Sequence, residues 1–154
     1  MKKIALFLFL SLFPLASQAF PANVLTTTPA EIVRKIETSP TPFMILAFAS
    51  WCPYCKKQID DLAKLTPADQ LRIPEIVAVS IDSDPQAYSN YLRSKTGVFF
   101  PMRLYVGDNN LESLLKNYGS TFDGGIPYLA IFKDKKLVKE FNGYTDPSAF
   151  KLAQ

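Results

Sequence analysis

Two short and almost purely apolar runs constrain the fold of this 154-residue chain more than any other feature. Residues 43–49 read FMILAFA and residues 75–81 read EIVAVSI, and both runs are too short for a typical helix. Apolar and polar residues do not alternate within them, so we expect two strands that are buried on both faces. Such strands are typical of parallel or mixed sheets covered by helices. The chain is therefore predicted to be an α/β protein with a central sheet.

Capping residues and prolines divide the rest of the chain into further elements. Thr28 before Pro29 and Asp84 before Pro85 are typical of helix starts, because a side-chain oxygen can cap the helix and proline suits its first turn. Pro101 interrupts a further apolar segment early. The expected elements are an initial strand near 23–26, helices at 28–39, 53–66, 84–97 and 111–119, strands at 43–49, 75–81, 99–106, 128–132 and 137–141, and a last helix from about 147.

The start of the chain, MKKIALFLFLSLFPLASQA, has the three parts of a secretory signal peptide. Two lysines precede an apolar run of about ten residues, and Ser17 and Ala19 place small residues before a cut at Phe20. The run is shorter than the roughly 20 residues that span a bilayer. We expect a signal peptide at 1–19, one domain at 20–154, and a periplasmic or secreted location. The alternative is an uncut anchor in the inner membrane with the domain facing the periplasm.

The charge balance without this signal is close to neutral. Two of the 17 Lys and Arg residues leave with it, so 15 basic residues face 14 acidic ones, a net charge of +1. This balance does not favour nucleic acid or an anionic membrane as a partner. No later segment is long and apolar enough to cross a membrane, and no dimerisation segment precedes the domain. We therefore expect a soluble monomer.

The chain has two cysteines, Cys52 and Cys55, and no histidine. A structural zinc site needs four Cys or His ligands, which the chain does not offer. A purely structural disulfide across three positions would close a very short loop and would stabilise the fold little. The third interpretation is a dithiol that exchanges with disulfides of other proteins, and the oxidising compartment expected after export makes it the leading one.

Exchange requires a thiolate, and the predicted position of Cys52 supplies one. Cys52 follows a buried strand and opens the helix that starts at Pro53, where unpaired N–H groups and the helix dipole lower a thiol pKa below about 8.5. We expect its sulfur to be reachable from solvent and to act as the nucleophile, with Cys55 buried one turn later as the resolving thiol. Trp51 and Tyr54 would form an apolar collar for substrate, although Trp51 could equally be a core residue.

The motif Trp51-Cys52-Pro53-Tyr54-Cys55 at a strand-to-helix junction resembles the thioredoxin superfamily. Ile126-Pro127, at the start of the predicted hairpin, resembles the cis-proline loop of that superfamily. The extra helix and strand between Ile81 and Gly119, followed by GGIPYLAIFKDKKLVKEFNG, are similar to the TlpA-like branch of exported thioredoxin-fold proteins. The resemblance covers roughly residues 28 to 145.

This resemblance implies a thioredoxin-like fold with a central mixed sheet, helices on both faces and a TlpA-like strand-helix insertion. It implies that Pro127 is cis and faces the cysteine pair, and that the Ile126 backbone pairs with a bound substrate strand. It also implies no cofactor besides the Cys52–Cys55 redox-active disulfide, and no metal. The partners would be protein thiols and disulfides, together with a membrane-embedded or soluble redox partner. The TlpA-like layout favours the reductase direction, and the large helical insertion of DsbA-type oxidants is absent.

Two positions depart from thioredoxin itself. Leu46 stands where thioredoxin has a buried aspartate, and Ala78 stands where its lysine partner would be. The acidic pocket residue and GxxGxP loop of many cytochrome-maturation members are not evident in the segment DGGIP. The resemblance therefore does not extend to the thioredoxin proton relay or to cytochrome c maturation. Two alternatives stay open: a peptide-binding or chaperone-like module with incidental thiols, and a thiol peroxidase.

Overall fold

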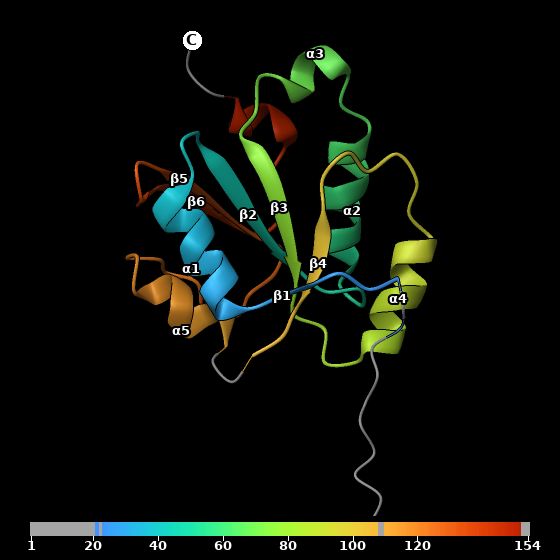
Figure 1. The fold of residues 1–154 in the computed structure, drawn as a ribbon. Coiled ribbons are helices and arrows are strands. Elements are labelled where there is room, and N and C mark those ends of the chain that lie inside the picture. Colours follow the sequence, from blue (N-terminus) through green and yellow to red (C-terminus); the bar gives the residue numbers. More distant parts are fainter. Residues whose placement is uncertain (1–20, 22, 108–109, 152–154) are drawn as a thin grey trace, which may run out of the picture.

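The computed structural model describes residues 21, 23–107 and 110–151. The predicted signal peptide lies outside these residues. The described chain forms a six-stranded sheet in the order β1-β4-β3-β2-β5-β6 (Figure 1). The first four strands of that order are parallel, and β5 and β6 run antiparallel to their neighbours.

The elements are β1 (Thr26–Thr27), α1 (Pro29–Thr38), β2 (Phe43–Phe48), α2 (Pro53–Ala63), α3 (Pro67–Gln70), β3 (Glu75–Ser80), α4 (Pro85–Arg93), β4 (Met102–Tyr105), α5 (Leu111–Lys116), β5 (Tyr128–Lys133), β6 (Lys136–Asn142) and the 3-10 helix η1 (Pro147–Phe150).

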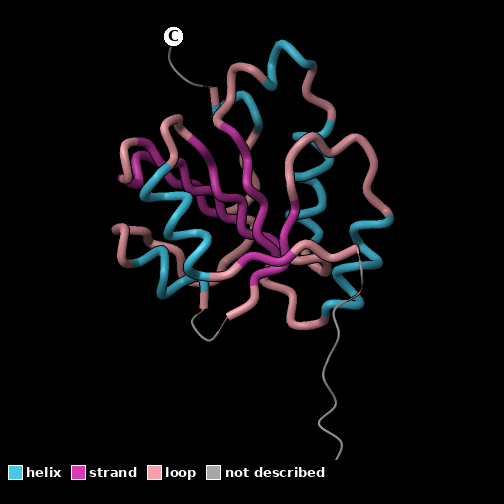
Figure 2. The backbone as a smooth tube through the Cα atoms, viewed as in Figure 1, coloured by secondary structure: helices cyan, strands magenta, loops and turns pink. Residues whose placement is uncertain are grey.

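The sheet lies between two layers of helices, with α1 and α5 on one face and α2 and α4 on the other (Figures 1 and 2). All six side chains of β2 are buried, and they alternate between the two faces. Phe43 and Ile45 join the apolar cluster under α1 and α5, while Met44 and Leu46 join the cluster under α2 and α4. The predicted mixed sheet with helices on both faces is therefore confirmed. No described helix has the length and apolar character needed to cross a bilayer.

The predicted insertion between Ile81 and Gly119 is also confirmed. Its helix and strand are α4 and β4, and β4 occupies the place in the sheet between β1 and β3. The short β1 therefore pairs with β4 rather than with β3. The insertion widens the sheet on the side away from β5 and leaves the β2–α2 junction at its centre.

The element bounds differ from the sequence-based expectation in several places, and the initial strand expected near 23–26 is the two-residue β1 at Thr26–Thr27. The strand expected from Phe99 starts at Met102, because Pro101 has no N–H to donate, although its carbonyl oxygen still accepts a hydrogen bond from Ala78. The last helix is a single 3-10 turn, closed by a bond from the Ala149 N–H to the Asp146 carbonyl. A short helix not expected from the sequence, α3, follows Thr66, whose hydroxyl caps it.

Candidate active site

The two cysteines lie where β2 leaves the sheet and α2 begins. Cys52 is the N-cap residue of α2, with extended backbone, and Pro53 occupies the first helical turn. A tight turn precedes it, in which the Cys52 N–H donates to the carbonyl of Ala49 across 3.2 Å. The buried strand and the proline-started helix thus place Cys52 at the junction, as the sequence predicted.

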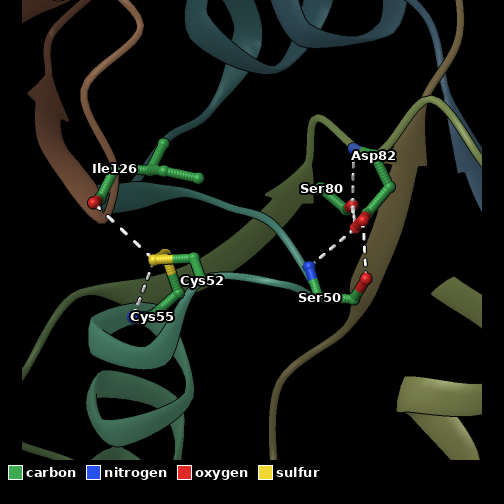
Figure 3. Close-up of a disulfide and its surroundings, with 6 residues drawn as sticks. All are labelled: Ser50, Cys52, Cys55, Ser80, Asp82 and Ile126. Atoms are coloured by element: carbon green, nitrogen blue, oxygen red, sulfur yellow. Dashed lines mark hydrogen bonds between the residues drawn. A yellow bond between two sulfur atoms is a disulfide. The ribbon is translucent and has the colours of Figure 1, made fainter. Parts of the chain in front are cut away.

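Cys52 and Cys55 form a disulfide, with their Cα atoms 5.2 Å apart. The Cys52 sulfur also accepts a hydrogen bond from the Cys55 backbone N–H, and the N–S distance is 3.1 Å (Figure 3). This N–H is one of the donors that an α-helix leaves unpaired at its start. In the dithiol state the same donor would stabilise a thiolate on Cys52, which is the electrostatic condition for exchange.

Exposure distinguishes the two sulfur-bearing residues. Cys52 retains 4 % of its surface and Cys55 retains 0 %. Cys52 is mostly buried in the disulfide state, because the residue packs in the apolar cluster and its sulfur lies 3.7 Å from the Ile126 carbonyl oxygen. The expected burial of Cys55 is confirmed. Of the two residues, Cys52 is the one that keeps some exposed surface.

The other residues predicted around the pair have unequal exposure. Trp51 is 69 % exposed and Tyr54 is 67 % exposed, so the interpretation of Trp51 as a core residue is wrong. Pro53 is exposed, Ile126 is half-buried and Pro127 is buried. The Ile126–Pro127 peptide bond is cis, as the resemblance implied.

Leu46 and Ala78 are register partners on β2 and β3, and both are fully buried. They belong to the same apolar cluster as Cys55. The structure therefore places two hydrocarbon side chains at the positions where thioredoxin has an aspartate and a lysine. Neither side chain can accept a proton.

A buried carboxylate near the junction was not among the predicted site residues. Asp82 follows β3 and accepts hydrogen bonds from the Ser50 N–H (2.9 Å) and the Ser50 hydroxyl (2.6 Å), and also from the Ser80 hydroxyl (Figure 3). Ser50 and Asp82 each lie two residues beyond the carboxyl ends of β2 and β3, and these neighbouring parallel strands end at the same edge of the sheet. That arrangement is the sequence signal that could have indicated this contact.

Gln58 is a second polar residue that sequence reasoning missed. It is fully buried on α2, and its amide donates to the Thr145 carbonyl (2.9 Å) and accepts from the Thr145 N–H (2.8 Å). In the same loop, the Gly143 N–H donates to the Pro127 carbonyl (2.8 Å). The loop after β6 therefore connects the cis-proline segment to the helix that carries the cysteines. The sequence signal that could have indicated this contact is a glutamine within the apolar face of a helix, where its amide needs buried hydrogen-bond partners.

Within residues 21, 23–107 and 110–151 no group of three or more His, Cys, Asp or Glu side chains is arranged to hold an ion. The two sulfurs are joined to each other.

Comparison with known proteins assigns the chain to a family. The family model described as Redoxin matches residues 15–153. The chain belongs to the redoxin family. Redoxins of this kind are thiol–disulfide oxidoreductases, and this one has the redox-active cysteine pair, Cys52 and Cys55, that such activity uses in place of a bound cofactor. The family implies thiols and disulfides of proteins as its substrates.

Solved structures share the thioredoxin-like fold of this redoxin at low sequence identity. StoA from Bacillus subtilis is 19 % identical with a TM-score of 0.56, over 74 % of this chain and 82 % of that one. A thioredoxin-family thiol:disulfide interchange protein from Chlorobium tepidum is 19 % identical with a TM-score of 0.56, over 71 % and 74 %. A secreted Mycobacterium tuberculosis disulfide oxidoreductase homologous to E. coli DsbE is 15 % identical with a TM-score of 0.51, over 71 % and 76 %. A search of curated protein sequences gives no match.

Proposed function

We propose that this redoxin exchanges disulfides with protein substrates outside the cytoplasm, with Cys52 as nucleophile and Cys55 as resolving thiol, and that it works as a reductase. The observation that carries the role of Cys52 is the hydrogen bond from the Cys55 N–H to its sulfur at the start of α2. A donor of this kind stabilises a thiolate in the reduced protein. The unequal exposure of the two cysteines supports the same assignment.

The reaction proceeds in two balanced steps. The Cys52 thiolate attacks one sulfur of a substrate disulfide, forming a mixed disulfide and releasing the other substrate sulfur as a thiolate. The Cys55 thiol then loses its proton and attacks the Cys52 sulfur, which forms the Cys52–Cys55 disulfide and releases the second substrate thiolate. The substrate has then gained two electrons. A dithiol donor, either membrane-embedded or soluble, must return two electrons to the pair.

Substrate binding is proposed for the surface beside the disulfide. Exposed Trp51 and Tyr54, with Pro53 between Cys52 and Tyr54, offer apolar area to an extended or unfolded chain. The Ile126 carbonyl lies beside the reactive sulfur, where a substrate backbone can pair with the segment that ends at Pro127. The same exposed aromatic side chains also suit a peptide-binding module whose thiols are incidental, and this is the second candidate function.

The proposed location rests on the first 19 residues. A signal peptide at 1–19 would leave the domain 20–154 in the periplasm or secreted, as a monomer. N-terminal sequencing of the protein recovered from that compartment tests this directly. A mature chain that starts at Phe20 supports cleavage, whereas a chain that retains Met1 and stays with the membrane supports the anchored alternative.

Matched serine variants test the chemistry. We expect Cys55→Ser to accumulate mixed disulfides with protein substrates, because the thiol that releases them is gone, and Cys52→Ser to accumulate none. Both are measured by non-reducing electrophoresis and mass spectrometry after alkylation. Trapping through Cys55 would reverse the two roles. If the double serine variant still prevents aggregation of an unfolded client as the wild type does, the binding module is the better description, and peroxide consumption by the wild type would favour a peroxidase.

Reductase direction is tested separately. We expect the wild-type pair, equilibrated with glutathione buffers, to have a reduction potential clearly below that of the buffer of an oxidising compartment, so that its dithiol form donates electrons. A pair that stays reduced in oxidising buffer would instead act as an oxidant.

A further inference from the structure

A buried carboxylate outside the exchange chemistry connects the ends of β2 and β3. Asp82 is 7 % exposed and receives three hydrogen bonds, two from Ser50 and one from Ser80. Its own backbone N–H donates to the Ser80 hydroxyl across 3.1 Å. A buried carboxylate needs such donors, because burying an unpaired charge is costly. These donors explain why the carboxylate is stable in a buried position.

Ser50 is the first central residue of the turn that leads into the CxxC motif. The turn runs from Ala49 to Cys52 and is closed by the bond from the Cys52 N–H to the Ala49 carbonyl. The path of the backbone through this turn directs the Trp51 side chain to solvent. It also brings the Cys52 sulfur within hydrogen-bond distance of the Cys55 N–H. Asp82 holds this turn from outside, through both the N–H and the hydroxyl of Ser50 (Figure 3).

We propose that Asp82 is a positioning residue of the exchange site, which fixes the turn at Ser50 so that the Cys52 sulfur stays aligned with the start of α2. The inference rests on the proposed function, because it assigns Asp82 a role through the nucleophile. Asp82 acts on Cys52 through two intervening backbone units and not by contact with substrate.

The charge of Asp82 would act in the opposite direction. A negative charge near Cys52 disfavours the thiolate, whereas correct alignment with the Cys55 N–H favours it. The negative charge of Asp82 also acts on two buried tyrosines. Burial is the main cause that raises the pKa of Tyr88 and of Tyr91, and repulsion from Asp82 raises both pKa values further. Removing the carboxylate therefore separates the two effects by the sign of the change.

The experiment measures the thiol–disulfide equilibrium of the full-length protein with glutathione, together with its free energy of unfolding. The variants are Asp82→Ala, Asp82→Asn and Ser50→Ala, and Ser80→Ala is the matched control. The control removes a donor from the same carboxylate on the β3 side and leaves both Ser50 bonds in place.

Asp82→Ala should shift the equilibrium constant about tenfold toward the disulfide, which is about 30 mV for this two-electron couple. Asp82→Asn, which keeps one acceptor oxygen for Ser50, should shift it less than about threefold, since part of the hydrogen bonding remains. Ser80→Ala should lose stability without moving the equilibrium. If Asp82→Ala does not fold, Ser50→Ala decides, with an expected shift toward the disulfide of about threefold for one lost hydrogen bond.

Three results overturn the inference. Equal shifts in Asp82→Ala and Ser80→Ala would mean that the carboxylate only stabilises the fold. A shift toward the dithiol in both Asp82 variants would mean that its charge matters more than its hydrogen bonds. An unshifted Ser50→Ala would remove the turn from the explanation. A wild-type protein that does not exchange with glutathione would instead overturn the proposed function, and this inference with it.

Discussion

The starts of α1 and α2 have the same local design with different atoms. Thr28 and Cys52 are both N-cap residues followed by proline, and each side chain accepts the N–H of the residue three positions later, at 3.3 Å in α1 and 3.1 Å in α2. In α1 that residue is Glu31, whose carboxylate accepts the Thr28 N–H and completes a capping box. In α2 that residue is Cys55, whose side chain forms a disulfide with the N-cap residue Cys52. The CxxC spacing is therefore the capping-box spacing with sulfur as the capping atom.

The surroundings of the two caps explain their different uses. Glu31 lies in the first turn of α1, and its hydrogen bond with the Thr28 backbone is the main cause that lowers its pKa. The first turn of α2 has no acidic side chain, so nothing competes with a thiolate for its N–H groups. Cys52 is also buried beside Ile126, whereas Thr28 is half-buried. An oxygen cap stabilises a helix, whereas a sulfur cap at a helix start without an acidic side chain is a thiol whose thiolate form the helix N–H groups favour.

The largest effect should come from giving α2 the cap of α1. Cys52→Thr should abolish disulfide exchange, because the nucleophile is lost, yet keep the free energy of unfolding under reducing conditions within about 1 kcal/mol of the wild type. Insulin reduction and denaturant unfolding with dithiothreitol measure the two quantities. Cys52→Ala is the control and should lose about 1 kcal/mol more, since it has no acceptor for the helix N–H. Equal stability of the two variants would break the analogy between the caps.

The reverse test removes the cap of α1. Thr28→Ala should lower the free energy of unfolding by about 1 kcal/mol and leave the exchange rate unchanged, because α1 lies away from the cysteines. Thr28→Ser keeps the hydroxyl and should behave as the wild type. A slower exchange rate in Thr28→Ala alone would show that the two helix starts are coupled.

A smaller effect is expected when the first turn of α2 receives an acidic residue, as the first turn of α1 has in Glu31. Tyr54→Glu places a carboxylate in the first turn beside Cys52, so the pKa of that thiol should rise and its alkylation rate at neutral pH should fall about threefold. Tyr54→Gln is the neutral control and separates charge from the loss of the aromatic ring. The difference between Glu and Gln should shrink in high salt, and a difference that does not shrink would argue against an electrostatic cause.

The smallest effect on stability is expected at Asp61, an acidic residue in the second half of α2. Hydrogen bonds from Lys57, Lys64 and Tyr144 hold the pKa of Asp61 well below its ordinary value of 3.8. A carboxyl group whose pKa is lowered by folding stabilises the fold above its unfolded pKa, and this contribution disappears as the pH falls. Asp61→Asn should therefore cost under about 1 kcal/mol at pH 7, with the difference from the wild type shrinking below pH 3.8.

Denaturant unfolding across that pH range, for both proteins, measures the difference. Exchange activity should not change in Asp61→Asn, because Asp61 lies two turns from the cysteines. A difference that grows at acid pH would contradict the assigned direction of the pKa shift.

Local patterns predicted most of the fold. A cap residue followed by proline begins a helix at Thr28, Cys52 and Asp84, as predicted. The run FMILAFA forms the central strand. The elements whose bounds or type differed were short, such as the strand expected from Phe99, which starts at Met102, and the last helix, which is a single 3-10 turn. A single turn or a proline-interrupted strand has too few residues for periodicity to decide between states.

The sequence by itself determined that a cysteine would cap the central helix and that a second would follow one turn later. Both results depend on contacts within a few residues, which propensity and capping chemistry control. Only the tertiary structure decided that Cys52 is buried beside Ile126, that Asp82 holds Ser50, and that Gln58 binds Thr145. These pairs are 74, 32 and 87 positions apart, and no local pattern specifies which distant polar group fills a site when sheet and helices pack.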